Sequence, residues 1–275
     1  MAINIVKDES VLFITLDSLR FDTFESAAAP NTKAVAPAHK AQAPSYFTFG
    51  SHAAMFMGFT PGVANLNRSF LNPKWGKLFR LANTGFPGTT KDGFILEGES
   101  IVDGFNRLGY ATIGSGAVKW FDNTTATGLS LTRHFASYFY SGGPFLDRQL
   151  TWIDAQISDA GNSRPVFVFL NIGETHIPYW HSGALWSQDD NPCVPFQSEN
   201  RRTDCEVRQR LCFEYVDRLL GELFRQFWRA TIVICADHGD CWGEEGLWEH
   251  GISHSATLTV PLLIRYWGTP IAADN

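Results

Sequence analysis

Five short runs of apolar, β-prone residues limit the folds open to this chain. They cover residues 11–16, 111–113, 165–172, 231–236 and 260–266. Amphipathic helical patterns lie between them, one over residues 144–159 and a longer one that begins at Thr203 and reaches Phe227. Glu206, three residues after Thr203, predicts a capping box at the start of the longer helix. Strands that alternate with helices predict a layered α/β fold with a mostly parallel sheet.

The organisation of the chain indicates one domain. A chain of 275 residues is long enough to bury about 70–75% of its unfolded surface around a single core. No internal repeat, low-complexity tract or linker divides residues 1–275. The segments 60–100 and 180–202 are rich in Gly, Pro, Asn and Ser, which is typical of long surface excursions.

Composition excludes several classes of protein. The longest apolar runs fall far short of the roughly 20 residues that span a bilayer, and the first residues lack the apolar stretch of a signal peptide. The net charge of −6 comes without a basic stripe that could bind nucleic acid. The five cysteines show no CxxC spacing, so neither a disulfide framework nor a zinc ribbon is expected. We therefore expect a cytoplasmic protein with no nucleic-acid or membrane partner.

Polar side chains follow three of the predicted strands at the point where each strand ends. Asp17 follows the first strand, Glu174 and His176 follow the third, and Asp237 and His238 follow the fourth. Any one of them alone is more typical of a turn or a helix cap. If the strands are parallel, however, their carboxyl ends meet at one edge, where α/β sheets bind ligands. Two carboxylates and an imidazole at that edge suit a divalent cation.

Thr48 stands just ahead of a short predicted helix over residues 51–57. The free N–H groups and the dipole at a helix start favour an anion. A threonine hydroxyl is a poor nucleophile at neutral pH, but coordination to a metal can activate it. By itself the segment is equally well explained as a helix cap. Beside a metal site it indicates a nucleophile.

Taken together, these segments resemble the sulfatase-like branch of the alkaline phosphatase superfamily over most of the chain. Residues 16–22 resemble its opening metal motif, and residues 48–58 match the spacing of the nucleophile motif C/S-x-P-S-R-x(5)-G. Residues 109–120 resemble the segment GYxT…GKW, with two extra residues, and residues 174–178 resemble T-H-x-P. Residues 237–264 follow D-[HN]-G…G-E-x-G-L-W-x-K…V-P-L without a gap.

The resemblance implies a fold and a metal site. The fold is a three-layer α/β/α sandwich around a mostly parallel mixed sheet, here with a reduced or absent C-terminal subdomain. A divalent metal ion (Zn, Mn, Mg or Ca) would be held by Asp17, Thr48, Asp237 and His238. Thr48 would also be the nucleophile, and His176 would contact a substrate oxyanion.

The number of metals stays open at this point. His250 stands where sulfatases carry a Lys that contacts the sulfate, and a His resembles the two-metal branches of the superfamily. Either Glu174, His176 and His250 hold a second metal, or the site has one metal and His250 is a substrate contact or general acid. Further candidates for contact with the substrate are His52, at the place of the motif's Arg, Lys119 and His254, although Lys119 is more typical of a solvated loop and His254 of a packed residue.

The nucleophile position separates two activities. Sulfatases oxidise a Cys or Ser there to formylglycine, and the methyl group on the β-carbon of Thr48 prevents formation of that aldehyde. The resemblance therefore implies a hydrolase or phosphotransferase that acts on small anionic phosphate mono- or diesters through a covalent threonine intermediate. The alternatives are a sulfuric ester hydrolase and a non-catalytic binding protein on the same fold. Part of the usual cleft wall is either missing or supplied by a second subunit of a homo-oligomer.

Overall fold

The computed structural model describes residues 5–58, 79–81, 94–96 and 99–269. Its centre is a sheet of seven strands in the order β2-β11-β8-β1-β7-β5-β6. The strands β1, β5, β6, β7 and β8 run parallel to their neighbours in this group, whereas β11 pairs antiparallel with β8 and β2. Their bounds are β1 Val11–Leu16, β2 Ala38–Gln42, β5 Ala111–Gly116, β6 Ser137–Tyr140, β7 Val166–Ile172, β8 Thr231–Ala236 and β11 Thr259–Arg265. The predicted mostly parallel mixed sheet is confirmed.

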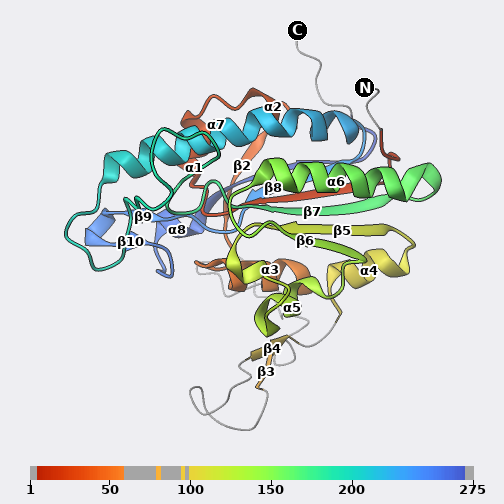
Figure 1. Cartoon of the computed structure of the whole chain (residues 1–275), viewed down its shortest axis with the longest axis horizontal. Coiled ribbons are helices and arrows are strands. Elements are labelled where there is room, and N and C mark those ends of the chain that lie inside the picture. Colours follow the sequence, from red (N-terminus) through yellow and green to blue (C-terminus); the bar gives the residue numbers. More distant parts are fainter. Residues whose placement is uncertain (1–4, 59–78, 82–93, 97–98, 270–275) are drawn as a thin grey trace, which may run out of the picture.

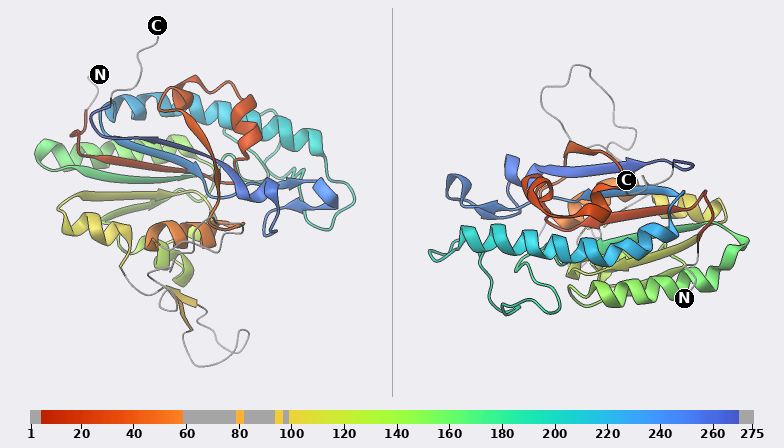
Figure 2. Two further views of the ribbon diagram at one scale, coloured as in Figure 1. Left: turned by 180° about the vertical axis from the view of Figure 1, so that it is seen from behind. Right: turned by 90° about the horizontal axis from the view of Figure 1, so that it is seen from above.

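Helices cover both faces of the sheet (Figures 1 and 2). One layer holds α1 (Phe21–Ser26), α2 (Pro30–Lys33), α6 (Leu146–Ala160) and α7 (Arg202–Gln226), and the other holds α3 (Thr48–Met57), α4 (Ile101–Arg107) and α5 (Ala126–Thr132). The chain is therefore the three-layer sandwich that the sequence predicts. In the described part of the chain, no helix combines the length and the apolar character needed to cross a bilayer.

Smaller elements complete the fold. A hairpin of β9 (Cys241–Trp242) and β10 (Trp248–Glu249), followed by α8 (Ser255–Leu258), lies beyond the carboxyl end of β8. The short strands β3 (Phe79–Leu81) and β4 (Phe94–Leu96) pair with each other. Three turns of 3₁₀ helix are η1 (Lys119–Phe121), η2 (Gly161–Ser163) and η3 (Glu244–Gly246).

The two faces of the sheet pack against different kinds of side chain. Along β1, Leu12 and Ile14 pack with aliphatic residues of the layer that contains α6 and α7. Phe13 points to the other face, where a cluster rich in phenylalanine joins β7 to α3, α4 and α5. β7 is buried along its whole length, as expected for a parallel strand covered on both sides. Many of the aromatic residues of this chain therefore fill one of its two cores.

Several element boundaries differ from the predictions. α7 begins at Arg202 after the N-cap residue Arg201, which makes no side-chain capping bond, so the predicted capping box of Thr203 and Glu206 is wrong. Glu206 pairs instead with Arg202, at 2.8 Å. β5 continues to Gly116, three residues beyond its predicted end. A Cβ at Gly114 would lie 2.8 Å from the ring of Phe135, so only glycine lets the strand run on beneath that ring.

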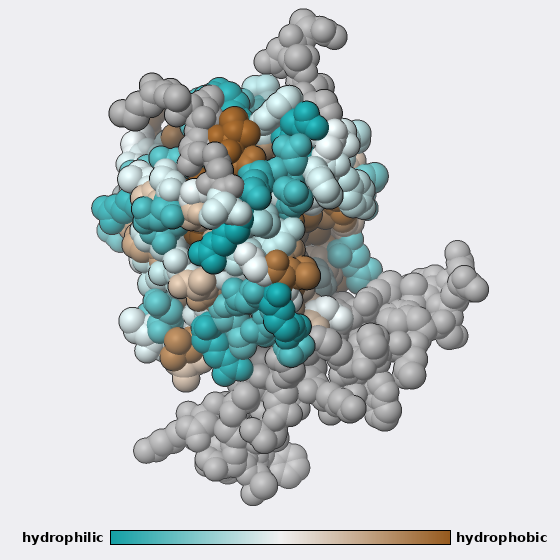
Figure 3. Space-filling view, turned by 90° about the vertical axis from the view of Figure 1, so that its right-hand side faces the viewer, coloured by the Kyte–Doolittle hydropathy of each residue, from teal (hydrophilic) through white to brown (hydrophobic). Residues whose placement is uncertain are grey.

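The predicted surface excursions have different outcomes. Residues 180–201 contain no helix or strand and form a loop before α7, as expected. Most of the segment 60–100 lies outside the described residues. The surface at the end of the sheet where the parallel strands begin shows hydrophobic residues scattered among hydrophilic ones (Figure 3). The clustered polar side chains lie at the opposite end.

Candidate active site

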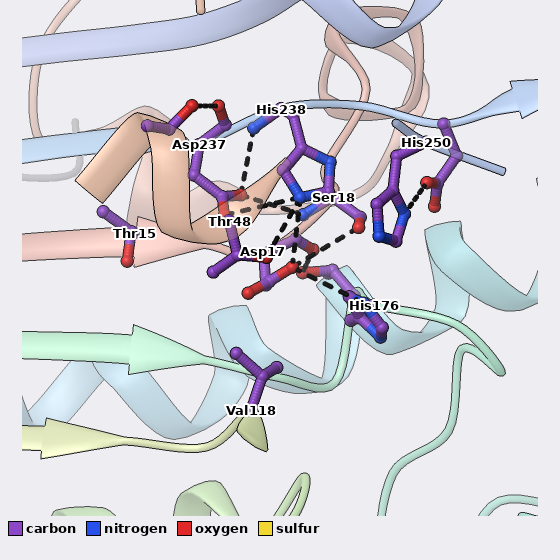
Figure 4. A network of polar contacts seen from close by, with 12 residues as sticks. Thr15, Asp17, Ser18, Thr48, Val118, His176, Asp237, His238 and His250 are labelled. Carbon is purple, nitrogen blue, oxygen red and sulfur yellow. Dashed lines mark hydrogen bonds and ion pairs between the residues drawn. The ribbon is translucent and has the colours of Figure 1, made fainter. Parts of the chain in front are cut away.

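Four buried side chains meet where β1 and β8 end and α3 begins (Figure 4). Leu16 of β1 pairs with Ala236 of β8 in parallel register, so the residues that follow them, Asp17 and Asp237, leave the sheet side by side. Thr48 is the first residue of α3, and His238 follows Asp237. All four side chains are fully buried.

Distances in this cluster are those of groups that can share one ion. Nε2 of His238 lies 3.2 Å from Oγ1 of Thr48, 3.7 Å from Oδ1 of Asp17 and 3.5 Å from Oδ2 of Asp237. One ligand atom from each of Asp17, Asp237 and His238 can be chosen so that all lie within 4.8 Å of one another. The structure thus brings together the four residues that the sequence proposes for the metal.

The hydrogen bonding of Asp237 leaves one oxygen free for a cation. Its Oδ1 accepts hydrogen bonds from the backbone N–H groups of Ser18 (3.1 Å) and His238 (3.0 Å), whereas its buried Oδ2 has no hydrogen-bond partner. Burial raises the pKa of Asp237 to about 6, and burial together with the charge of Asp237 raises the pKa of Asp17. Two buried carboxylates that repel each other, one with an unpaired oxygen, fit a divalent cation.

Local contacts fix the start of α3, which begins at Thr48 rather than after it as predicted. The hydroxyl of Ser51 lies 2.6 Å from the carbonyl oxygen of Asp237 and ties the helix to the end of β8. Gly50 is needed because a Cβ there would lie 2.6 Å from Oγ of Ser45 and 2.8 Å from the ring of Phe47. The hydroxyl of Thr48 therefore lies at the positive end of α3, and the contacts at Ser51 and Gly50 fix the position of this helix.

The sequence predicts that His52 contacts the substrate. In the structure His52 lies beneath Thr48 and is too deeply buried to do so. It is fully buried, with Nδ1 2.8 Å from the carbonyl oxygen of Thr48 and Nε2 2.9 Å from Oγ1 of Thr15. Its ring packs edge-on against Phe121, with centroids 4.8 Å apart. Burial lowers the pKa of His52 to about 3, so the ring is neutral, its Nδ1–H donates to Thr48 and its Nε2 accepts from Thr15. His52 holds the nucleophile candidate in place.

Two further imidazoles flank the cluster (Figure 4). Nε2 of His176 lies 4.0 Å from Oδ1 of Asp17. The ring of His250 lies with its centroid 4.5 Å from that of His238 and 5.2 Å from that of His176. Both side chains are partly exposed, at 24% for His176 and 16% for His250. They form the open side of an otherwise buried site.

Asp240 also belongs to the site, although nothing in the sequence pattern distinguishes it. The β9–β10 hairpin pairs Cys241 with Glu249, so Asp240 and His250, the next residues outward, face each other. Nδ1 of His250 donates to Oδ1 of Asp240 at 2.8 Å, and the hydroxyl of Tyr179 donates to Oδ2 at 2.7 Å.

The contact with Asp240 changes the protonation of His250. Although burial opposes the charge, the hydrogen bond to Asp240 and the charge of that carboxylate raise the pKa of His250 to about 9. His238, Asp240 and His250 also form a second group with ligand atoms within 4.8 Å.

Glu174, a candidate ligand of a second metal, is in neither of the two groups of possible metal ligands found among the described residues. Oε1 of Glu174 accepts the backbone N–H of Leu146 at 2.7 Å, at the start of α6. The side chain is fully buried, and burial raises its pKa to about 7. A carboxylate at the N-terminus of a helix stabilises the unpaired N–H groups there. Glu174 therefore caps α6.

His254 and Lys119, the remaining candidates for contact with the substrate, lie in different surroundings. His254 is the N-cap of α8, and its Nδ1 accepts the backbone N–H of Ala256 at 3.0 Å, which makes it a structural cap. Lys119 is exposed on η1, where it lines a cavity together with His176 and Pro178.

The mixed sheet has the fold of alkaline phosphatase-like and sulfatase-like proteins, and it carries a buried acidic and histidine cluster and a hydroxyl at a helix start. One similar structure is described as a protein of the alkaline phosphatase superfamily from Vibrio parahaemolyticus (TM-score 0.56, 16% identity, 97% of this chain and 62% of that one). The chain belongs to the Sulfatase family, whose model matches residues 9–272.

Other solved structures share the fold at low identity. The C-terminal periplasmic domain of the phosphoethanolamine transferase EptC from Campylobacter jejuni has a TM-score of 0.66 and 13% identity, over 94% of this chain and 78% of that one. The corresponding domain of EcEptC from Escherichia coli, in complex with Zn, has a TM-score of 0.61 and 13% identity, over 94% and 73%. No curated protein sequence matches this chain.

Proposed function

We propose that this protein is a metal-dependent hydrolase or phosphotransferase of phosphate mono- or diesters, and that Thr48 is its nucleophile. The observation that carries the proposal is the 3.2 Å approach of Oγ1 of Thr48 to Nε2 of His238, inside a fully buried cluster with two carboxylates. The packing of a threonine hydroxyl does not require such surroundings. They favour a hydroxyl that reacts as an oxyanion.

The proposed ligands of the cation are Asp17, Asp237, His238 and the Thr48 oxygen. When bound, a divalent cation supplies positive charge that stabilises the ionised hydroxyl and the negative oxygens of the ester. The α3 N-terminus directs its dipole at the same place. His52 holds Thr48 from below through the hydrogen bond to its carbonyl oxygen.

The proposed reaction has two displacements at phosphorus. In the first, the Thr48 oxygen bonds to phosphorus while the bond to the leaving alcohol breaks, which gives phosphothreonine. In the second, water or an acceptor alcohol attacks that phosphorus, and the hydroxyl of Thr48 is regenerated. In this proposal His250, which is held protonated by Asp240, gives its proton to the leaving alcohol, and His176 contacts an ester oxygen.

Phosphorus is preferred to sulfur because of the nucleophile. A threonine cannot become formylglycine, so the usual route to sulfate ester hydrolysis is closed to Thr48. The names of two similar structures, both phosphoethanolamine transferases or their domains, support phosphoryl chemistry on this fold. The substrate in this proposal is a small anionic ester.

The test is activity with defined metals. The purified protein is freed of metal, loaded with Zn²⁺, Mn²⁺, Mg²⁺ or Ca²⁺, and assayed on 4-nitrophenyl phosphate, bis(4-nitrophenyl) phosphate and 4-nitrophenyl sulfate. We expect metal-dependent release of nitrophenol from a phosphate ester, and its loss in Thr48→Ala with metal binding kept. A faster rate on the sulfate would favour the sulfatase alternative. No metal binding and no turnover would favour a non-catalytic binding protein.

A further inference from the structure

Asn171 is a fully buried amide near the end of β7. Because side chains of a strand alternate between its two faces, Asn171 shares a face with Phe167 and Phe169, which belong to the cluster rich in phenylalanine. Burial of an amide beside apolar side chains costs free energy unless its hydrogen bonds are made. The row of phenylalanines thus ends in an amide at the point where β7 reaches the candidate site.

Each polar atom of this amide has partners in the structure. Its Oδ1 accepts the backbone N–H groups of Ala117 (3.3 Å) and Val118 (3.4 Å), at the end of β5. Because a backbone N–H can only donate, these contacts fix the position of the oxygen and turn Nδ2 the other way. Nδ2 donates to Oδ2 of Asp17 at 3.2 Å and to Oγ1 of Thr15 at 3.4 Å. The amide is therefore held in one orientation.

The contact with Asn171 distinguishes the two oxygens of Asp17. Oδ2 accepts from Asn171, whereas Oδ1 is the atom that lies 3.7 Å from Nε2 of His238 and 4.0 Å from Nε2 of His176. Asp237 is arranged in a similar way, because its Oδ1 accepts two backbone N–H groups and its Oδ2 has no hydrogen-bond partner. Each carboxylate is thus anchored through one oxygen, and its other oxygen lies toward the histidines.

Thr15 connects this contact to the nucleophile candidate. Thr15 is the residue of β1 that pairs with Asn171 in register, and its Oγ1 also lies 2.9 Å from Nε2 of His52. His52 in turn contacts the carbonyl oxygen of Thr48. One chain of hydrogen bonds therefore runs from Asp17 to the start of α3.

We infer that Asn171 is a positioning residue of the metal site, which holds Oδ2 of Asp17 so that Oδ1 can bind the cation. The inference rests on the proposed function, which it deepens by naming a residue outside the set of ligands on which the affinity for metal depends. Such outer partners of metal ligands typically contribute about 10–100-fold in affinity. An amide that only completed the packing of β7 would contribute to stability and not to metal binding.

The experiment compares wild type, Asn171→Ala and the control Gln149→Ala. Gln149 is also a fully buried amide, and its Nε2 donates, at 3.0 Å each, to Oγ of Ser115 and to the backbone oxygen of Asn171 rather than to a carboxylate. The dissociation constant for Zn²⁺ is measured by competition with a chromophoric chelator, and the ligand geometry by the visible spectrum of the Co²⁺-loaded protein. Urea unfolding of the metal-free proteins measures stability.

We expect Asn171→Ala to weaken Zn²⁺ binding about 10–100-fold and to change the Co²⁺ spectrum, whereas Gln149→Ala should keep the wild-type affinity and spectrum. Both variants should lose stability without metal. Wild-type affinity in Asn171→Ala, or an equal loss of affinity in Gln149→Ala, would overturn the inference. If Asn171→Ala does not fold, Asn171→Ser takes its place, because the serine hydroxyl ends one atom closer to the backbone and loses the contact with Asp17.

A double-mutant cycle shows whether Asn171 acts through Asp17. In the Asp17→Ala background, Asn171→Ala should lower the affinity for Zn²⁺ by no more than about twofold, because the oxygen that the amide holds is gone. Additive losses would overturn the inference, since Asn171 would then act independently of Asp17.

Failure of the proposed function has a different signature. If wild type binds none of the divalent cations, the metal site fails, and the proposed function and the inference fail with it. If wild type binds metal and hydrolyses a phosphate ester, but Asn171→Ala binds metal equally well, only the inference fails.

Discussion

Asp17 and Asp237 are two buried carboxylates at the centre of the candidate site. Both are fully buried, and their ion-pair partners in the described part of the chain are histidines rather than Lys or Arg. Uncompensated buried carboxylates cost several kcal/mol or take up protons. A bound divalent cation would offset this cost.

Neutralising Asp237 should have opposite effects with and without metal. Because its folded pKa of about 6 lies above the usual 3.8, the metal-free protein loses stability as the pH rises through that range. In Asp237→Asn the oxygen that accepts from Ser18 and His238 can remain, so we expect the metal-free variant to be more stable than wild type by about 2 kcal/mol at pH 8. Urea unfolding at pH 4 and pH 8 measures the difference.

With metal bound, wild type should be more stable than Asp237→Asn, the reverse of the order without metal. Wild type should gain stability when Zn²⁺ or Mn²⁺ is added, whereas Asp237→Asn should gain much less. A variant that is destabilised at pH 8 without metal, and still responds fully to metal, would contradict the role given to Asp237.

We predict that Asp240 acts through His250, because its carboxylate accepts a hydrogen bond from that imidazole. It fixes the ring by accepting from Nδ1, and such outer partners of a site typically contribute about 10–100-fold in activity or metal affinity. We expect Asp240→Asn to lower kcat by about that factor and to lower the pH above which activity falls, because the proton on His250 is then held less tightly.

The matched control for Asp240→Asn is Asp204→Asn, which removes a carboxylate from a surface ion-pair network on α7. Its pH–rate profile should match that of wild type. An unchanged profile in Asp240→Asn would show that His250 does not depend on this carboxylate.

At the scale of elements, the bounds of strands that are apolar throughout were predictable. The edge strands were not. The bounds of β1 and β8 equal those predicted, because buried parallel strands are apolar throughout. β2, with the sequence AHKAQ, is mostly exposed at the edge of the sheet, and nothing in its pattern distinguishes it from a loop. Asp240 was missed for a related reason, since only the β9–β10 register shows that it faces His250.

The role of Glu174 as the cap of α6 leads to a prediction about stability. Its folded pKa of about 7 exceeds the usual 4.5, so its ionisation destabilises the folded state progressively from about pH 4.5 to about pH 7. Gln keeps an oxygen that can accept from Leu146. We expect Glu174→Gln to raise the free energy of unfolding by about 1–3 kcal/mol at pH 8 and to change it little at pH 4.

Metal titration of Glu174→Gln separates the two roles considered for this residue. If Glu174 only caps α6, the affinity for metal should be the same in Glu174→Gln and in wild type. A marked loss of metal binding in the variant would indicate that Glu174 is a ligand of a second metal.

At the scale of the whole molecule, the layered fold followed from alternating strands and helices, and the position of the site followed from the parallel strands. The family resemblance implies that Asp17, Thr48, Asp237 and His238 form one cluster, and the structure brings them together. His52 and His254 could not be placed, because the spacing of residues in a motif does not show the depth of a side chain. Both turn out to be structural.

Metal binding at the junction of β1, β8 and α3 should stabilise the entire fold. At about 100 times its dissociation constant, a ligand that binds only the folded state adds about 2.7 kcal/mol, which for a domain of this size raises Tm by roughly 5–10 °C. Thermal unfolding with excess EDTA and with Zn²⁺ or Mn²⁺ measures this shift. A Tm that none of the divalent cations changes would contradict a metal site at this junction.

The covalent role of Thr48 is tested most directly by mass spectrometry of the enzyme during turnover. Metal-loaded protein is mixed with 4-nitrophenyl phosphate, quenched in acid and digested, and wild type is compared with Thr48→Ser and Thr48→Ala. The account predicts that the peptide containing Thr48 gains the mass of one phosphoryl group in wild type, and that Thr48→Ser gains it at the same position, whereas Thr48→Ala does not. Turnover with the modification at another residue, or undiminished turnover in Thr48→Ala, would contradict it.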